Sequence, residues 1–418
     1  MLQNLLNLKE VKLFFSRYLK ELPDFSKALN LEVLDIHFCS QLTSVHPSIL
    51  SLEKLEKLDL SHCTSLIELT SDTHTSSLRY LNLKFCKNIR KFSVTSVNMI
   101  ELDLRYTQVN TLPASFGCQS NLEILHLGNC SIESFPLCFK NLIKLQYLEV
   151  RYCQKLQNLP VLPPSLEILL AQECSTLKTV FFPSTAEQFK ENRKRVVFAN
   201  CLKLDEHSLT NIVSNAQINI TKFAYQHVSA SRHEFHNKFN NYNDDDSYQA
   251  LYVYPGSCVP EWFEYKTTTD YVVIDLSSST SHSPFLGYIF GFVLGGNRLI
   301  VDMLKFNITL CVEGQGKEED HFELYISRPS ANIVSDHVFM IYDQQCSCYL
   351  NSKAKDITRF KIKVTTRLSS MHPRSYSDIC MMLKGFGVNI INTSAYHNFI
   401  QKMGLPDSTR NISSGIEM

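Results

Sequence analysis

The sequence predicts a solenoid of short repeats followed by an antiparallel β-sandwich, a combination of α/β and all-β architecture. A leucine-containing phrase returns at nearly constant spacing through the first half of the chain, and a cysteine closes most of its copies. The second half carries short β-rich runs separated by Gly, Ser, Pro and Asp. A fixed period of about 20 to 50 residues indicates stacked repeats, and short alternating runs favour a sandwich.

The repeated phrase is Leu-x-x-Leu-x-Leu-x-x-Cys, and its clearest copy runs from Leu31 to Cys39. Copies begin at Leu8, Leu31, Leu55, Leu78, Met99, Leu122, Leu145 and Leu166, with spacings of 21 to 24 residues. This is the leucine-rich-repeat signature. Within each copy a short strand points alternate side chains into the core and the others outward. One turn cannot bury its own apolar edge, so the turns must stack as a solenoid (horseshoe).

The repeat region is expected to end at residue 204. A displaced copy from Arg193 to Cys201 fits one final turn, and its basic residues Arg193, Lys194 and Arg195 would form the polar end of the stack. The alternative interpretation of these three residues is a nuclear localisation signal. Prolines that follow apolar residues, such as Pro113 after Leu112, predict short helical turns or extended chain between the strands.

Half of the fourteen cysteines follow the repeat rather than a disulfide pattern. Cys39, Cys63, Cys86, Cys130, Cys153, Cys174 and Cys201 occupy the same phase of successive copies. They predict a ladder of small buried thiols. The close pair Cys346 and Cys348 has no second pair at zinc spacing, so no metal site is expected. Reduced thiols and a first segment without a secretory pattern favour a cytoplasmic protein, with the nucleus as the alternative location.

Composition and motifs argue against several classes of function. Lysine and arginine equal aspartate and glutamate, 41 against 41, so neither nucleic acid nor a membrane surface is an expected partner. No run approaches about twenty apolar residues. The chain has no Gly-x-Ser-x-Gly, no His-Glu-x-x-His and no phosphate-binding loop, and Gly314–Lys317 has the wrong spacing for one. We therefore expect a protein that is not an enzyme and takes no cofactor.

Beyond the repeats, the sequence predicts four further segments. Residues 205–228 have apolar side chains at helical spacing and predict one amphipathic helix. Residues 229–248 are polar and predict a linker or loop. Residues 249–400 hold the β-rich runs and predict the sandwich, with Trp262, the only tryptophan, expected in its core. Residues 401–418 predict a flexible tail.

The outward positions of the repeat strands carry the candidate binding residues. Tyrosine and arginine are favoured anchors of protein interfaces. In several copies the residue just before the closing position is aromatic, and we expect these rings to form a stripe along the same side. The candidate protein-binding residues are Phe38, Tyr80, Lys84, Phe85, Asp103, Arg105, Tyr106, Tyr147, Arg151 and Tyr152. For any one residue, a solvated charge or an aromatic packed on a loop is the alternative. For the face as a whole, we expect binding.

Three features resemble plant intracellular immune receptors of the Toll/interleukin-receptor-type, nucleotide-binding, leucine-rich-repeat family. They are the repeats ending in Cys, the stretch Val196–Leu204, and above all Tyr254–Lys266, which reads YPGSCVPEWFEYK. Ser335–Tyr342 and Lys384–Ile390 are similar to later strands of that family's post-repeat jelly-roll/immunoglobulin-like domain. The resemblance covers about residues 1 to 400.

The resemblance implies direct or indirect sensing of a pathogen effector, with a guarded host protein as the indirect partner. The repeats and the post-repeat domain would form the recognition surface. The family's signalling domain and nucleotide switch have no counterpart in this sequence, so ATP binding and NAD cleavage are not carried over. Two alternatives remain: an autoinhibitory module that binds the nucleotide-binding domain of the same receptor, and a truncated decoy or regulator.

Overall fold

The structure is a computed structural model that describes residues 5–71, 77–183, 185–188, 191–230, 248–277, 285–295, 300–312, 321–355, 357–369 and 382–404. The chain divides into two compact units. The first holds residues 1–183 and 201–211, and the second holds residues 184–200 and 212–418. Of the predicted linker, residues 231–247 lie outside the described residues, as do residues 405–418 of the predicted tail and the Gly314–Lys317 stretch.

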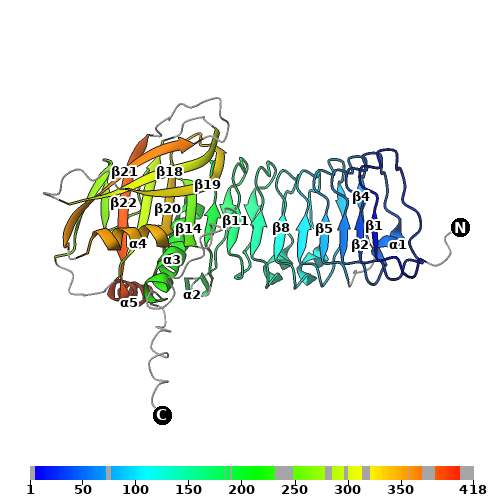
Figure 1. Cartoon of the computed structure of the whole chain (residues 1–418), viewed down its shortest axis with the longest axis horizontal. Helices are drawn as coiled ribbons and strands as arrows, with labels where there is room; N and C mark the ends of the chain where they lie inside the picture. The colour runs from blue at the N-terminus through cyan, green and yellow to red at the C-terminus, as the bar shows by residue number, and fades with distance from the viewer. Residues whose placement is uncertain are drawn as a thin grey trace, which may run out of the picture. The chain divides into compact units, whose positions relative to one another are not determined.

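The first unit is a row of parallel strands, one from each repeat (Figure 1). In order they are β1 (Glu10–Lys12), β2 (Val33–Asp35), β3 (Lys57–Asp59), β5 (Tyr80–Asn82), β7 (Glu101–Asp103), β8 (Ile124–His126), β9 (Tyr147–Glu149) and β11 (Ile168–Leu170). The central leucines of neighbouring strands pair in register, as Leu34 does with Leu58 and Leu58 with Leu81. All three are at most 2% exposed. The leucine-rich-repeat solenoid predicted from the sequence is therefore confirmed.

Short elements connect these strands, as the prolines predict. They are α1 (Pro47–Leu50), η1 (Ala114–Cys118) and η2 (Leu137–Asn141), and two pairs of two-residue parallel strands, β4 (Glu68–Leu69) with β6 (Lys91–Phe92) and β10 (Asn158–Leu159) with β12 (Thr179–Val180). Pro113 and Pro136 lie immediately before η1 and η2. Proline suits the start of a helical turn, where no backbone donor is needed.

The predicted thiol ladder is confirmed. The seven phase-matched cysteines are buried and free. Six of them direct Sγ at a backbone carbonyl of the preceding repeat at 2.9 to 3.2 Å, as Cys63 does toward Ile36 and Cys86 toward Leu60. In the repeat without a cysteine, the Thr107 hydroxyl donates to the Leu104 carbonyl at 2.8 Å. Several of these carbonyls also accept a backbone N–H, as Leu60 does from Cys63 at 3.1 Å, so the Sγ donors supplement the hydrogen bonds of the turns.

The second unit contains two sheets. Strand β13 (Arg195–Val197) pairs in parallel with β14 (Gln249–Pro255), and antiparallel strands β20 (His337–Asp343), β17 (Gly287–Leu294), β22 (Leu383–Ile391) and β15 (Tyr265–Thr267) follow. The other sheet has the order β16 (Tyr271–Asp275), β21 (Arg359–Ser369), β18 (Ile300–Cys311) and β19 (Phe322–Asn332). Phe292 of β17 stacks on Phe306 of β18 with ring centroids 4.1 Å apart, which joins the two sheets.

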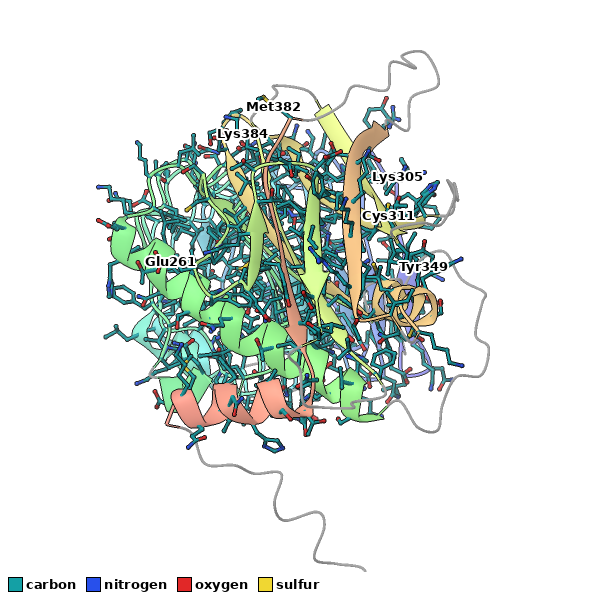
Figure 2. All side chains as sticks on the ribbon, turned by 90° about the vertical axis from the view of Figure 1, so that its left-hand side faces the viewer. Glu261, Lys305, Cys311, Tyr349, Met382 and Lys384 are labelled. Carbon is teal, nitrogen blue, oxygen red and sulfur yellow. The ribbon has the colours of Figure 1, made fainter. Side chains whose placement is uncertain are left out.

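Four helices accompany these sheets in the described residues: α2 (Thr185–Gln188), α3 (Glu206–Ala230), α4 (Gln344–Lys353) and α5 (Thr393–Lys402). Figure 2 faces this unit, with Lys305 and Cys311 marking β18 and Tyr349 marking α4. Helix α3 begins one residue after the predicted boundary and ends two residues beyond it. Trp262 is only partly buried, and the neighbouring Phe263 is the core residue at 2% exposed.

The basic residues Arg193–Arg195 do not form an exposed polar end, so that prediction is wrong. Arg193 is 1% exposed and Arg195 8% exposed. The Arg193 guanidinium donates to both carboxylate oxygens of Glu191, Nε to Oε2 at 2.9 Å and Nη2 to Oε1 at 2.7 Å. Asn215 of α3 donates to Glu191 at 3.1 Å and accepts from the Tyr252 hydroxyl at 2.9 Å. A buried ion pair with these extra hydrogen bonds replaces the expected surface charge.

His337 joins two distant stretches of the second unit. It is fully buried, its Nε2 accepts from the Asn200 backbone N–H at 2.9 Å, and its Nδ1 lies 2.8 Å from the Ser335 carbonyl. A ring that donates from Nδ1 and accepts at Nε2 is neutral. Burial lowers the pKa of His337, against smaller opposing effects of the Ser335 carbonyl and Asp336.

The second unit should therefore lose stability in mild acid. Because the pKa of His337 is depressed in the folded state, the unfolded chain takes up protons first once the pH falls below about 6.5. Burial lowers the pKa of His227 on α3 as well, with the same sign. The free energy of unfolding should be constant just above this pH and should fall from pH 6.5 to 5.5. Urea unfolding followed by Trp262 fluorescence measures this.

His337→Gln serves as the comparison, because a glutamine amide oxygen can accept from Asn200 and does not titrate. The variant should show a shallower pH dependence than the wild type. Equal slopes in the two proteins would exclude His337 as the source.

Candidate protein-binding surface

The outward side chains of β5, β7, β8 and β9, with the residues just after these strands, form the surface that we call the strand face. Parallel register places equivalent positions in columns. Across these four strands the first column is Tyr80, Glu101, Ile124 and Tyr147, the second is Asn82, Asp103, His126 and Glu149, and the third is Lys84, Arg105, Gly128 and Arg151. Six of the ten predicted binding residues lie in these columns.

Arg105 is held by acidic residues of the face itself. Its Nε lies 3.0 Å from both carboxylate oxygens of Asp103, and its Nη1 lies 3.7 Å from Glu149 Oε2. Asp103 is only 5% exposed, so the carboxylate is screened little by water. Desolvation lowers the pKa of Arg105, but the hydrogen bond and charge of Asp103 outweigh it and raise the pKa overall. Arg105 is a fixed charge within the surface.

Glu149 is the centre of the neighbouring contacts. His126 Nδ1 lies 2.9 Å from Glu149 Oε2, and the Tyr147 hydroxyl donates to the same oxygen at 3.5 Å. Burial alone would raise the pKa of Glu149, but the His126 hydrogen bond and the charges of Arg151 and Arg105 lower it below its usual value. Burial, and then Glu149, raise the pKa of Tyr147 to about 12.

Gly128 leaves the space that this cluster needs. A Cβ at this position would lie 2.9 Å from Glu149 Oε1 and 3.6 Å from Arg105 Cγ. Because glycine has no Cβ, the side chains of Arg105, just after β7, and of Glu149 on β9 can meet across the intervening strand β8. The sequence shows this glycine, but only the register reveals that it faces Glu149.

A stack of five aromatic rings runs along the turns that follow the strands. Its members are Phe15, Phe38, His62, Phe85 and Tyr106, with successive ring centroids 4.6, 4.0, 4.6 and 4.2 Å apart. All five have φ near +60°, a left-handed conformation that is uncommon for large side chains. Stacking between repeats offsets part of the cost of that conformation.

The predicted aromatic stripe is thus present in part. Phe38, Phe85 and Tyr106 belong to the stack, but Asn129 occupies the next turn, so Tyr152 is separated from it. Sequence reasoning missed Phe15 and His62, although both stand one residue before the closing position of their copies. Their shared phase was the signal that could have found them.

The exposed members of the predicted site are mostly aromatic. Phe38, Tyr80 and Tyr106 are 36, 38 and 39% exposed. Lys84 Nζ lies 5.4 Å from the centre of the Phe85 ring, within the range of a cation–π contact. Beside Tyr80, a cavity of about 380 Å³ is lined by Lys57, Leu58, Asp59, Tyr80, Leu81, Asn82, Glu101 and Asp103. The face therefore offers rings, fixed charges and a hollow within a few strands.

Within the described part of the chain, no three His, Cys, Asp or Glu side chains gather where they could hold a metal ion. Among the helices of that part, none has the length and apolar character to cross a membrane.

Comparison with known proteins gives one family and several relatives. The Leucine Rich Repeat family matches residues 121–142. Disease resistance-like protein DSC1 of Arabidopsis thaliana is 28% identical over 385 residues, which cover 82% of this chain and 31% of that protein. Disease resistance protein RML1B of the same plant is 34% identical over 232 residues, 51% of this chain and 22% of that protein. The chain thus spans about a third or less of the length of these curated relatives.

Among solved structures, the leucine-rich-repeat domain of the type III effector XopL is 20% identical, with a TM-score of 0.32. That match covers 47% of this chain and 70% of the other. The functional domain of InlJ from Listeria monocytogenes is 15% identical, with a TM-score of 0.22, over 43% of this chain and 52% of the other.

Proposed function

Because the homologues of this chain are plant disease resistance proteins of the Toll/interleukin-receptor-type, nucleotide-binding, leucine-rich-repeat class, we propose that it is a protein-recognition module of such a receptor. The module acts in the cytoplasm and senses a pathogen effector, or a host protein that the effector modifies. It binds through the strand face, the expected concave face of the repeats, together with the second unit. It performs no catalysis.

The observation that carries this proposal is the composition of the strand face. Exposed tyrosines share this face with Arg105, which Asp103 and Glu149 hold in place, on strands whose leucines are buried. Rigid aromatic and arginine side chains contribute much of the binding energy of protein interfaces, because ordering them costs little entropy. For the second unit we propose a β-sandwich, supported by two antiparallel sheets joined through Phe292 and Phe306.

A second candidate function is autoinhibition of the receptor's own nucleotide-binding domain. The relatives are three or more times longer than the matched region, which leaves most of their length for other parts. Binding of this chain to such a domain, supplied as a separate protein without effector, would favour this function. The two functions can coexist, because one surface can bind the domain until an effector displaces it.

The double variant Arg105→Glu and Arg151→Glu tests the strand face. We expect it to weaken capture of an effector, selected from a panel with the wild-type chain, by about a hundredfold or more, since two anchor charges are reversed. Surface plasmon resonance measures the affinity, and circular dichroism checks that the variant folds.

Lys178→Glu with Lys203→Glu is the matched control. It reverses two charges at exposed positions outside the strand face and should leave capture within about threefold of the wild type. Full capture by the arginine variant would exclude the strand face as the binding surface. If the wild-type chain binds no effector of the panel but binds the nucleotide-binding domain, autoinhibition becomes the leading function.

A further inference from the structure

The two arginines of the strand face differ in what holds them. Arg105 contacts Asp103 and Glu149. Arg151 stands two strands away in the same column, and its side chain makes no hydrogen bond or ion pair with any described residue. Its Nε is buried without a partner. The Nε donor of Arg105 is therefore satisfied within the fold, and that of Arg151 is not.

The neighbours of Arg151 do not supply the missing partner. Glu149 lies on the same strand, but its Oε2 is already occupied by His126 and Tyr147. Gln172 lies beside Arg151 on the next repeat, where the Tyr152 N–H donates to the Gln172 carbonyl at 2.9 Å. The side-chain Oε1 of Gln172 is buried and has no hydrogen-bond partner either. Arg151 thus interacts with Glu149 through its charge, which acts to lower the pKa of Glu149, while its Nε donor is left without a hydrogen-bond acceptor.

A partly buried guanidinium without a partner costs free energy, because it has lost water and gained nothing in return. A carboxylate satisfies such a group best, since its two oxygens match two parallel N–H donors. Tyr147 and Tyr152, which precede and follow Arg151 in the sequence, are themselves partly buried. The positive charge of Arg151 acts on the neighbouring Tyr152. It lowers the pKa of the Tyr152 hydroxyl, against the larger effect of burial, which raises it.

We propose that Arg151 receives an aspartate or glutamate side chain of the partner protein, bound at the carboxyl end of β9. Arg105 then has a different role: it keeps Asp103 and Glu149 neutralised, so that an incoming acid is not repelled. The proposal rests on the proposed recognition function and names the chemistry of the partner's central contact. It predicts an acidic segment on the partner, not a basic one.

Binding of a fluorescein-labelled hexaglutamate peptide, followed by anisotropy, tests the proposal without an effector. We expect Arg151→Gln to weaken binding by about tenfold, equivalent to about 1.4 kcal/mol. Arg151→Lys should give an intermediate loss, because lysine keeps the positive charge but lacks the two parallel N–H donors of the guanidinium. Lys178→Gln removes one exposed charge outside the strand face and should change binding less than about twofold. Hexaglutamine should not bind.

The second arm uses the effector captured by the wild-type chain. There, Arg151→Gln should weaken capture, and replacing the partner's contacting acid by its amide should remove the difference between wild type and variant. Equal loss in Arg151→Gln and Lys178→Gln would overturn the proposal, since it would show a general charge effect. So would undiminished capture by Arg151→Gln, although capture itself would still support the recognition function. Absence of any captured effector counts against that function instead, and the peptide arm then decides the proposal.

Discussion

Replacing Glu191 by Ala is expected to destabilise the second unit by about 3 to 5 kcal/mol, because it leaves the Arg193 charge buried without its carboxylate. Both side chains are completely shielded from solvent. The substitution also removes one of the two acceptors of the Asn215 amide and leaves only Gln188 Oε1, at 3.0 Å. Breaking one side of a buried pair costs more than the pair contributes, since the remaining ion cannot return to water.

The measurement is urea unfolding followed by the fluorescence of Trp262, the only tryptophan, which lies in this unit. Glu261→Ala is the control: it removes an exposed carboxylate next to the same reporter and should change stability by less than about 0.5 kcal/mol. The double variant Glu191→Leu with Arg193→Met should recover much of the loss, because it removes both charges. A small effect of Glu191→Ala alone would mean that Arg193 is solvated.

Replacing Leu58 by Ala is expected to destabilise the repeat unit by about 2 to 5 kcal/mol. Leu58 is completely buried, and its strand pairs with β2 on one side and β5 on the other. The cavity therefore opens between Leu34 and Leu81, which are both fixed by their own neighbours and cannot close it. Because each repeat touches only adjacent ones, the loss should be concentrated near β3.

Hydrogen exchange of the backbone amides measures this local effect. Protection should fall most in β2, β3 and β5 and least in β9 and β11. Lys57→Ala, on the same strand but exposed, should leave protection unchanged. A uniform loss over all repeats would indicate that the unit unfolds as one cooperative block.

The repeat strands could be predicted from the sequence because their signal is local. The central residue of nearly every three-residue strand is a leucine, and this leucine specifies which side of the strand is buried. The fixed period specifies which strands are neighbours. The buried cysteines follow from the same phase. The columns of the strand face, such as Asp103 beside Asn82 and His126, then follow from register alone.

What the sequence did not reveal depends on contacts between distant residues. A run of basic residues predicts a surface, because charges are rarely buried without a partner. Arg193 is buried because Asn215, farther along the chain, donates to its partner Glu191 and is itself held by the Tyr252 hydroxyl. Likewise, the pattern could not distinguish Arg105 from Arg151, since their different partners depend on side-chain geometry. The left-handed turn at Phe38 has no signal in residue type.

The reactivity of the buried thiols can report which repeats have unfolded. Burial raises the pKa of Cys63 to about 12, so almost none of this thiol is ionised at neutral pH, and only the ionised form reacts with alkylating reagents. Cys118, Cys258 and Cys311 are exposed and should be alkylated first. The seven buried cysteines of the ladder should react only as their own repeats unfold. Mass spectrometry of alkylated peptides would then show the order in which the repeats open, with a gap at Thr107.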